Sequence, residues 1–164
     1  MPESNYLPLR RATAADLDVL VRHRVRMFAE MGFQSDDRFE ALSAACRSWF
    51  AGALERGTYL GWLIAPAAAP ETIVAGAGML LLDWPPGVRD AGTTRAYILN
   101  VYTEPEHRGH GLATLATRAA VEEARRRGIR VVTLHASDEG RAIYERLGFE
   151  ATNEMWLILD LDQE

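Results

Sequence analysis

The sequence predicts one domain over residues 1–164 with an α+β, or mixed α/β, fold. Two observations lead to this prediction. The chain has 164 residues, of which 48% are hydrophobic and 25% are charged, a composition typical of one globular domain with a sizeable core. The spacing of apolar residues also alternates between helical and strand periods, in the order β–α–α–β–β–β–α–β–α–β.

The N-terminal part predicts a short strand followed by two helices. Residues 7–11 are typical of the strand. Thr13 is a suitable N-cap, and Asp16 stands at the position of the acid in a capping box. Apolar residues then follow at helical spacing, which predicts a helix over residues 14–31. A second helix is expected to start at Asp36 or Asp37 and to stop at Gly57.

The middle of the chain changes to short apolar runs of strand type. Three of these runs are separated by proline- and glycine-containing turns, which favours antiparallel pairing between them. The predicted strands cover residues 59–64, 73–82 and 94–103.

The C-terminal part returns to alternating elements. After a turn at residues 104–107, two closely spaced glycines open a long helix that Gly128 is expected to end. The remaining predicted elements are a strand at 129–135, a short helix at 138–147 and a strand at 155–159 that closes the sheet.

Charge and composition exclude several classes of protein. The net charge is −5 with a pI near 5.4, which disfavours nucleic-acid binding. The longest apolar run, residues 73–82, is about half of a membrane span. Residues 1–5 are polar and unlike a secretory signal, and a lone Cys46 excludes an intrachain disulfide. We therefore expect a cytoplasmic protein that binds neither membrane nor nucleic acid.

A glycine loop at residues 108–114 carries the strongest chemical signal. Gly109 and Gly111 allow the backbone to approach a ligand, and the helix that follows contributes free N–H groups and its positive end. Arg108 adds a fixed positive charge. These features suit a pyrophosphate.

Other folds also contain glycine loops. A P-loop is excluded because the chain has no lysine: all 18 basic positions are arginine. A dinucleotide-binding loop requires three glycines directly after a strand, and here Thr114 holds the third position. An ordinary glycine-containing helix start is the remaining alternative if the loop is considered alone.

A second motif removes that ambiguity. Residues 142–149 read Ala-Ile-Tyr-Glu-Arg-Leu-Gly-Phe, about thirty residues after the loop. With Arg108, Gly111 and Ala113 matching an Arg/Gln-x-x-Gly-x-Gly/Ala pattern, the chain resembles the GNAT superfamily, the GCN5-related N-acetyltransferases. The resemblance implies a mixed, mostly antiparallel sheet, splayed at its central parallel pair and flanked by about four helices.

The resemblance also implies acetyl-CoA as cosubstrate, bound where the strands at 94–103 and 129–135 separate. Backbone groups of the first strand would pair with the pantetheine arm and polarise the thioester carbonyl. Loop amides and the Thr114 hydroxyl would hold the pyrophosphate, whereas Ser137 replaces a family asparagine that contacts CoA. The expected cofactor-binding residues are Leu99, Val101, Thr103, Arg108, Gly109, His110, Gly111, Leu112, Ala113, Thr114 and Ser137.

Two residues are the expected catalytic groups. By the resemblance, Tyr144 is the general acid that reprotonates the leaving CoA thiolate, since phenol and thiol have similar proton affinities. Arg95 stands near the strand position where some members carry a catalytic glutamate. Glu30 is one candidate for removing the amine proton, because it stands at the end of the first helix, and the resemblance implies that this helix and the next wall the acceptor site. The other candidates are Asp83, Tyr97, Asn100, Glu154 and Trp156.

These features predict an acetyl-CoA-dependent N-acetyltransferase that transfers an acetyl group directly to a primary amine of a small molecule or peptide. The alternative is a non-catalytic acyl-CoA-binding module. His107 and His135 lack the spacing of a metal site, so no metal is expected. A homodimer remains open. Because the chain has no lysine, any acceptor lysine belongs to another molecule.

Overall fold

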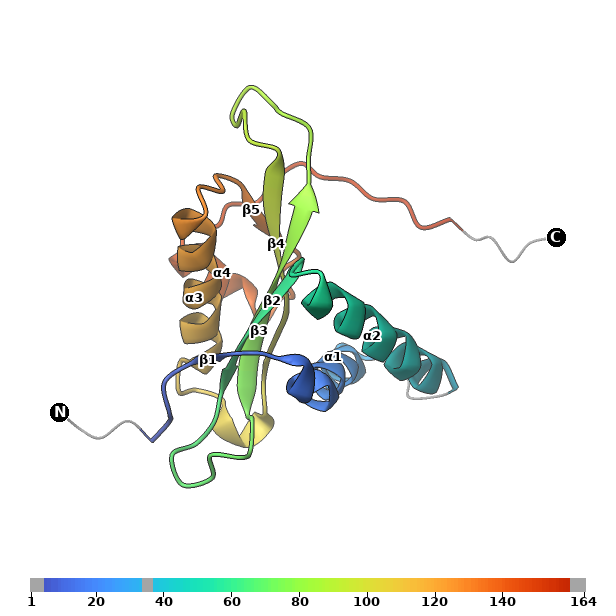
Figure 1. Cartoon of the computed structure of the whole chain (residues 1–164), viewed down its shortest axis with the longest axis vertical. Coiled ribbons are helices and arrows are strands. Elements are labelled where there is room, and N and C mark those ends of the chain that lie inside the picture. The colour runs from blue at the N-terminus through green and yellow to red at the C-terminus, as the bar shows by residue number, and fades with distance from the viewer. Residues whose placement is uncertain (1–4, 34–36, 160–164) are drawn as a thin grey trace.

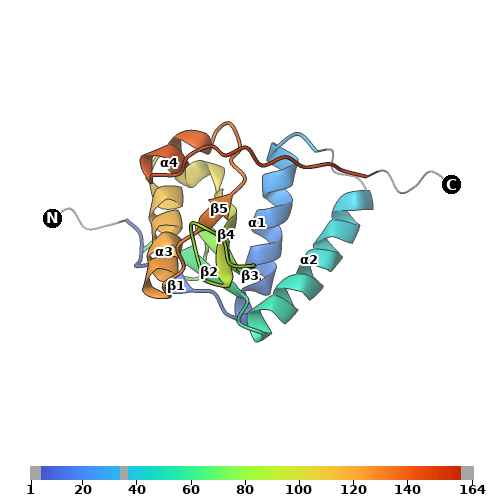
Figure 2. The same cartoon turned by 90° about the horizontal axis from the view of Figure 1, so that it is seen from above.

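The computed structural model describes residues 5–33 and 37–159, and its helices cover both faces of one sheet (Figures 1 and 2). Helices α1 and α2 lie on one face, and α3 and α4 on the other. In chain order the elements are β1 (Arg10–Arg11), the 3-10 helix η1 (Ala14–Asp16), α1 (Leu17–Glu30), α2 (Asp37–Glu55), β2 (Tyr59–Ile64), β3 (Ala75–Asp83), β4 (Thr94–Thr103), the 3-10 helix η2 (Pro105–His107), α3 (Leu112–Arg126), β5 (Val132–Leu134) and α4 (Arg141–Arg146).

The sheet has the predicted mixed topology. Its strands follow the order β1-β2-β3-β4-β5, and every neighbouring pair is antiparallel except β4 and β5. The parallel pairing is short and runs from Ala96 opposite Val132 to Ile98 opposite Leu134. Beyond Ile98, β4 therefore continues without β5 beside it.

The predicted strand at 129–135 is too long. Its first residue, Ile129, takes part in the C-terminal cap of α3 instead. Gly128 has a φ of 73°, and its N–H donates to the Arg125 carbonyl. The Ile129 N–H donates to the Ala124 carbonyl, which completes a Schellman motif. Ile129 thus belongs to the helix cap, and β5 starts three residues later.

The predicted closing strand at 155–159 is wrong for the described structure. This segment has no strand assignment and leaves the sheet instead of pairing with it (Figure 1). An apolar run favours a strand only where a neighbouring edge is available to it, and here the chain is directed away from β5. The other predicted bounds shift by a few residues, and the start of α2 at Asp36 lies outside the described residues.

A β-bulge divides β4 into two halves. Gly78 pairs with Leu99 and Gly76 pairs with Tyr102, so two residues of β4 stand opposite one residue of β3. Asn100, inside the bulge, has a φ of 55°, and its Nδ2 donates to the Leu20 carbonyl of α1 over 3.2 Å. The bulge therefore turns the second half of β4 relative to the first.

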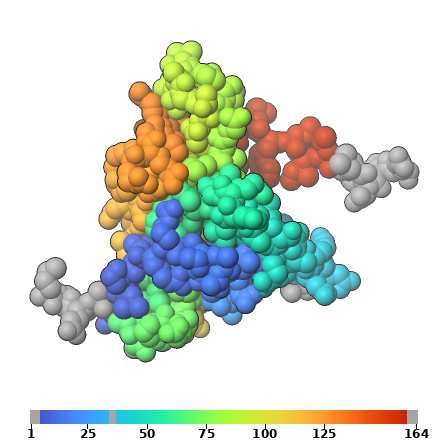
Figure 3. All heavy atoms as spheres, viewed as in Figure 1, coloured from blue at the N-terminus to red at the C-terminus, as the bar shows by residue number. Residues whose placement is uncertain are grey.

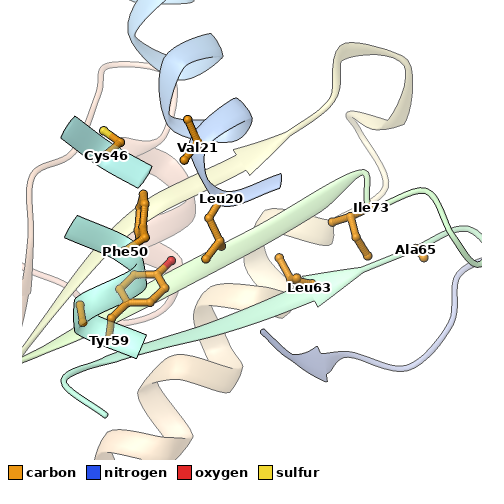
Figure 4. Packing of buried hydrophobic residues seen from close by; sticks show 9 residues of the cluster. Leu20, Val21, Cys46, Phe50, Tyr59, Leu63, Ala65 and Ile73 are labelled. Carbon is orange, nitrogen blue, oxygen red and sulfur yellow. The ribbon is translucent and has the colours of Figure 1, made fainter. Parts of the chain in front are cut away.

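Apolar side chains fill both sides of the sheet. Between the sheet and helices α1 and α2, Leu20, Phe50 and Tyr59 pack together, and all three are almost fully buried (Figure 4). On the opposite face, Ala120 and Ala124 of α3 pack against the first half of β4. No helix of the described residues is long and apolar enough to cross a membrane.

The predicted capping box at Thr13 is confirmed. The Thr13 hydroxyl accepts from the Ala15 N–H, and the Thr13 N–H donates to the Asp16 carboxylate over 2.8 Å. Arg10 donates to both carboxylate oxygens of Asp16, at 2.7 and 2.9 Å. Asp16 thus joins β1 to the start of the first helix.

We expect Asp16→Asn to lower the free energy of unfolding by about 2 kcal/mol at pH 7. Hydrogen bonding from Arg10 holds the pKa of Asp16 below its usual range, against the effect of burial. The carboxylate therefore stabilises the fold above about pH 4, and this contribution is lost as the pH falls through the lowered pKa. Urea unfolding at several pH values measures the difference, which should shrink in acid.

Asp18→Asn is the control for this substitution. Asp18 pairs with Arg47 at the surface, where an exposed ion pair contributes less than about 1 kcal/mol. Equal losses for the two variants at pH 7 would contradict the role assigned to Asp16.

Candidate active site

The glycine loop places the N-terminus of α3 after the carboxyl end of β4, the part of β4 that has no β5 beside it. Gly109 and Gly111 have φ values of 78° and 74°, a region that strongly favours glycine. A Cβ at either position would have no atom within 4 Å, so the backbone conformation and not the space requires glycine. Gly111 caps α3 without a side chain, and no acidic residue lies in its first turn. The amides there suit an anionic group.

The side chains around this loop point in different directions. Leu112 is buried in the core under α3, so only its backbone is available to a ligand. The His110 ring lies 5.7 Å from the Tyr6 ring. The Ser137 Oγ accepts from the Gly140 N–H over 3.1 Å and is already used by the chain itself.

Arg108 is held in place by residues from two other elements. Its Nε donates to the Thr103 carbonyl over 3.0 Å, and its Nη2 pairs with the Glu30 carboxylate at the end of α1. The Tyr102 hydroxyl donates to the other Glu30 oxygen over 2.8 Å. The sequence singled out Glu30 and Arg108 separately and did not predict this contact. The contact connects the end of α1, which is expected to border the acceptor site, with the glycine loop.

These contacts fix the charge of Glu30. Partial burial opposes ionisation, but hydrogen bonds from Tyr102 and Arg108 hold the pKa of Glu30 below its usual range. Burial and the neighbouring carboxylate raise the pKa of Tyr102 to about 12. At neutral pH the carboxylate is therefore charged and the phenol is protonated.

A second group of charged side chains lies between α1 and the residue that follows β4. Glu104 is buried, and its carboxylate pairs with Arg26 and lies 3.4 Å from the Arg22 Nε. His23 is fully buried beside it, and burial together with the two arginines lowers the pKa of His23 to about 3. His23 is therefore neutral at neutral pH. Arg22, Arg26 and Glu104 themselves line a cavity of about 330 Å³, together with residues of η2 and of the segment before β3.

The predicted pantetheine contacts lie on an unpaired edge. Leu99, Val101 and Thr103 follow the last β4–β5 pair, and on the other side their backbone faces β3. Among the described residues, no strand pairs with this part of β4 on the β5 side. An extended ligand can therefore add there as a strand, with the glycine loop at its far end.

Tyr144 lies in α4, and its ring partner Phe149 packs against the core cluster that Val101 and Leu134 also contact. Its ring is buried and packs edge-on against Phe149 at 6.1 Å, and the Phe149 N–H donates to its carbonyl. Gly140 lies so close that a Cβ there would approach the ring to 3.0 Å. Burial raises the pKa of Tyr144, so its hydroxyl is protonated at neutral pH. Within the described chain this hydroxyl has no hydrogen-bond partner.

Sequence reasoning missed a second polar group at the point where β4 and β5 separate. The Tyr97 hydroxyl and His135 Nδ1 share a hydrogen bond. His135 Nε2 lies 4.0 Å from the Glu154 carboxylate, and its ring lies 5.7 Å from the Trp156 ring. The candidates Tyr97, Glu154 and Trp156 thus gather around one imidazole. The parallel register that brings them together was not visible in the sequence.

The candidate Asp83 lies elsewhere, because it pairs with Thr94 at the far end of β4. Arg95, near the strand position where some members carry a glutamate, has its guanidinium 3.8 Å from the Trp84 ring centroid. Across the residues that the structure describes, no group of three His, Cys, Asp or Glu side chains is placed to hold a metal ion.

Comparison with known proteins identifies the family. Residues 20–149 match the family model described as "Acetyltransferase (GNAT) family". The chain belongs to this family. The GNAT resemblance drawn from the two motifs is therefore confirmed, and so is the GNAT fold with its parallel β4–β5 pair.

Solved structures resemble this GNAT chain over nearly its whole length. A GCN5-related N-acetyltransferase from Ralstonia eutropha JMP134 is 32% identical, with 93% of this chain and 97% of that chain covered and a TM-score of 0.85. A predicted acetyltransferase from Clostridium acetobutylicum, solved with acetyl-CoA, is also 32% identical, with 94% and 96% covered and a TM-score of 0.80.

A curated relative matches a shorter part of this GNAT chain. An uncharacterized N-acetyltransferase from Methanocaldococcus jannaschii is 38% identical over 58 residues, which is 34% of this chain. The match spans about a quarter of that relative, 26% of its length.

Proposed function

We propose that this GNAT chain is an N-acetyltransferase that transfers an acetyl group from acetyl-CoA directly to a primary amine of a small molecule or peptide. One observation carries the proposal: the unpaired edge of β4 from Leu99 to Thr103 leads straight to the glycine loop. The relative from Clostridium acetobutylicum solved with acetyl-CoA supports the same cosubstrate.

The cosubstrate would lie along β4 and end at α3. Backbone groups of Val101 and Thr103 would pair with the pantetheine arm, as a neighbouring strand does. Amides from Arg108 to Ala113, with the Thr114 hydroxyl, would bind the pyrophosphate. Glu30 and Tyr102 hold Arg108 beside this path, so their contribution is to keep its guanidinium in position.

The transfer step follows from these positions. The amine nitrogen attacks the thioester carbon, and a backbone N–H near the β4 bulge stabilises the negative oxygen. The C–S bond then breaks, and the Tyr144 hydroxyl gives its proton to the leaving thiolate. The nitrogen loses its proton to a base, and Tyr144 is reprotonated from solvent.

Two groups are proposed for removing the amine proton. Glu30 stays a prediction in this role, although its lowered pKa and two hydrogen bonds favour positioning Arg108 or binding an ammonium group. The Tyr97–His135 pair stands where β4 and β5 separate, and an imidazole is the side chain that most often serves as a general base. Glu154 would stabilise the imidazolium that forms.

A panel of amines tests the proposed function. Thiol release from acetyl-CoA is followed with alkylamines, amino acids and peptides, and calorimetry measures acetyl-CoA binding in parallel. Turnover with at least one amine supports the enzyme. Tight binding without any turnover would favour the non-catalytic acyl-CoA-binding module, and no binding would contradict both.

His135→Gln should lower kcat for an alkylamine by about 100-fold, because the amide keeps a hydrogen-bond partner for Tyr97 but accepts no proton. An arylamine is already neutral at pH 7, so its kcat should fall much less. Steady-state kinetics with both amines measures the difference. Glu30→Gln serves as the comparison variant, and a larger alkylamine-selective loss in it would assign the base to Glu30 instead.

A further inference from the structure

Arg24 is a half-buried cation of α1 whose charge no carboxylate balances within the described part of the chain. Its guanidinium lies 5.0 Å from the centroid of the Phe28 ring, one helical turn further along. The two neighbouring arginines of this helix, Arg22 and Arg26, both approach the Glu104 carboxylate. Partial burial of a guanidinium costs free energy unless an anion accompanies the charge. Arg24 is therefore a candidate for binding an anionic ligand.

The position of Arg24 is between α1, α2 and the sheet. Burial raises the pKa of the Cys46 thiol in α2 and of the Tyr97 phenol in β4, and in both cases the positive charge of Arg24 acts in the opposite direction. One turn earlier in α1, the Leu20 carbonyl accepts a hydrogen bond from Asn100 of β4, which holds this part of the helix against the strand. The guanidinium is thus close to Tyr97.

The proposed proton acceptor lies on this same face of the sheet. Ile98 packs in the core under α3, whereas Leu99 contacts the core between the sheet and α1, so Tyr97 also faces α1. The Tyr97 hydroxyl shares its hydrogen bond with His135. The described C-terminal segment, which carries Glu154 and is red in the figures, extends toward the side of the molecule that α1 and α2 occupy (Figures 2 and 3).

The charges on this face suit a small molecule with two charged ends. The Glu154 carboxylate lies 4.0 Å from His135 Nε2 and attracts an ammonium group to the proton acceptor. Arg24 supplies the positive charge on the α1 side. A single planar guanidinium binds a carboxylate through two parallel hydrogen bonds. A phosphate suits this site less well, because one arginine leaves part of its second charge uncompensated and Glu154 is nearby.

We propose that Arg24 binds the carboxylate of the acceptor, so that the acceptor is an amine with a carboxylate close to its amino group, as in an amino acid. This inference rests on the proposed function and assigns the substrate class of the same site. With the carboxylate held, the amino group is directed toward the Tyr97–His135 pair. The N–C bond forms as the C–S bond breaks, the amine proton goes to His135 and the Tyr144 proton to the thiolate. The products are an N-acetylated amino acid and CoA.

Matched pairs of acceptors test this proposal. Each amino acid is compared with its own carboxamide, which keeps the amino group and the side chain and replaces only the carboxylate. The carboxamide has the lower amine pKa because no negative charge stabilises its ammonium form, so a preference for the acid cannot come from a larger amount of neutral amine. At saturating acetyl-CoA, we expect kcat/KM to be about 30-fold higher for the acid.

Three variants assign the preference to its residue. Arg24→Gln should remove the preference and leave the rate with the carboxamide nearly unchanged, whereas Arg24→Lys keeps the charge without the planar fork and should retain part of it. Arg47→Gln is the matched control, because Arg47 is a surface arginine of α2 that pairs with Asp18, and it should keep the preference of the wild type. Each variant is judged by the ratio of the two acceptors, which a loss of folded protein does not change.

The outcomes separate this inference from the proposed function. If the wild type acetylates carboxamides and simple alkylamines as fast as amino acids, the carboxylate site is wrong and the acetyltransferase still stands. An undiminished preference in Arg24→Gln, or an equal loss in Arg47→Gln, would also overturn the role of Arg24. If no amine of the panel is acetylated, both proposals fall.

Discussion

Tyr144→Phe is expected to lower kcat with a reactive amine by about 100-fold, the usual contribution of a positioned general acid. Phenylalanine keeps the buried ring and its packing against Phe149 and removes only the hydroxyl. The KM for acetyl-CoA should change little, because the hydroxyl acts on the leaving sulfur. Burial raises the pKa of Tyr144, so in the wild type the acid should stay protonated beyond about pH 10.

Phe149→Leu separates the proposed acid from a purely structural residue. If Tyr144 serves only the core, loosening its ring partner should impair kcat as much as removing the hydroxyl. If Tyr144 is the acid, the two variants should differ. Phe149→Leu should lower the unfolding temperature and largely preserve kcat, whereas Tyr144→Phe should lower kcat and largely preserve the unfolding temperature. Unchanged turnover in Tyr144→Phe would remove this residue from the mechanism.

Gly111→Ala should raise the KM for acetyl-CoA by about tenfold. At a φ of 74°, a side chain costs about 1–2 kcal/mol, and the loop can relieve this strain by turning its amides away from the pyrophosphate. A loss of about 1.4 kcal/mol in binding corresponds to the tenfold change. Initial rates at varied acetyl-CoA and saturating amine measure it, and kcat should change less than KM.

Gly128→Ala is a closely matched control for this variant. Gly128 stands at the other end of α3 with a φ of 73°, and a Cβ there would also have no atom within 4 Å. Both variants should therefore lose similar stability in thermal unfolding. If Gly128→Ala raised the KM as strongly as Gly111→Ala, the effect would reflect general destabilisation and not the cofactor loop.

The sequence predicted most elements because local signals mark their ends. Thr13 and Asp16 form the expected capping box, and Gly128 ends α3 where expected. The closing strand at 155–159 could not be judged in this way. Apolar residues indicate that a segment favours a strand, but whether it pairs depends on where the preceding chain directs it.

Candidate site residues could be named from the sequence where they lie within motifs along the chain. The glycine loop and Tyr144 were named because each belongs to a short pattern, and their roles stay predictions. The Tyr97–His135 contact and the Glu30–Arg108 pair connect positions 38 and 78 residues apart. They follow from the parallel register of β4 with β5 and from the packing of α1, neither of which a single sequence reveals.

The bulge in β4 makes the site sensitive to chain length as well as to residue type. Ala96 and Ile98 face α3, whereas Asn100 and Tyr102 bond to α1, because the extra residue reverses which alternate positions face which layer. In a regular strand of the same length, Tyr102 would face α3 as Ile98 does, and its hydroxyl would be separated from Glu30. The contact between Tyr102 and Glu30 therefore depends on this one extra residue and not only on the residue type at position 102.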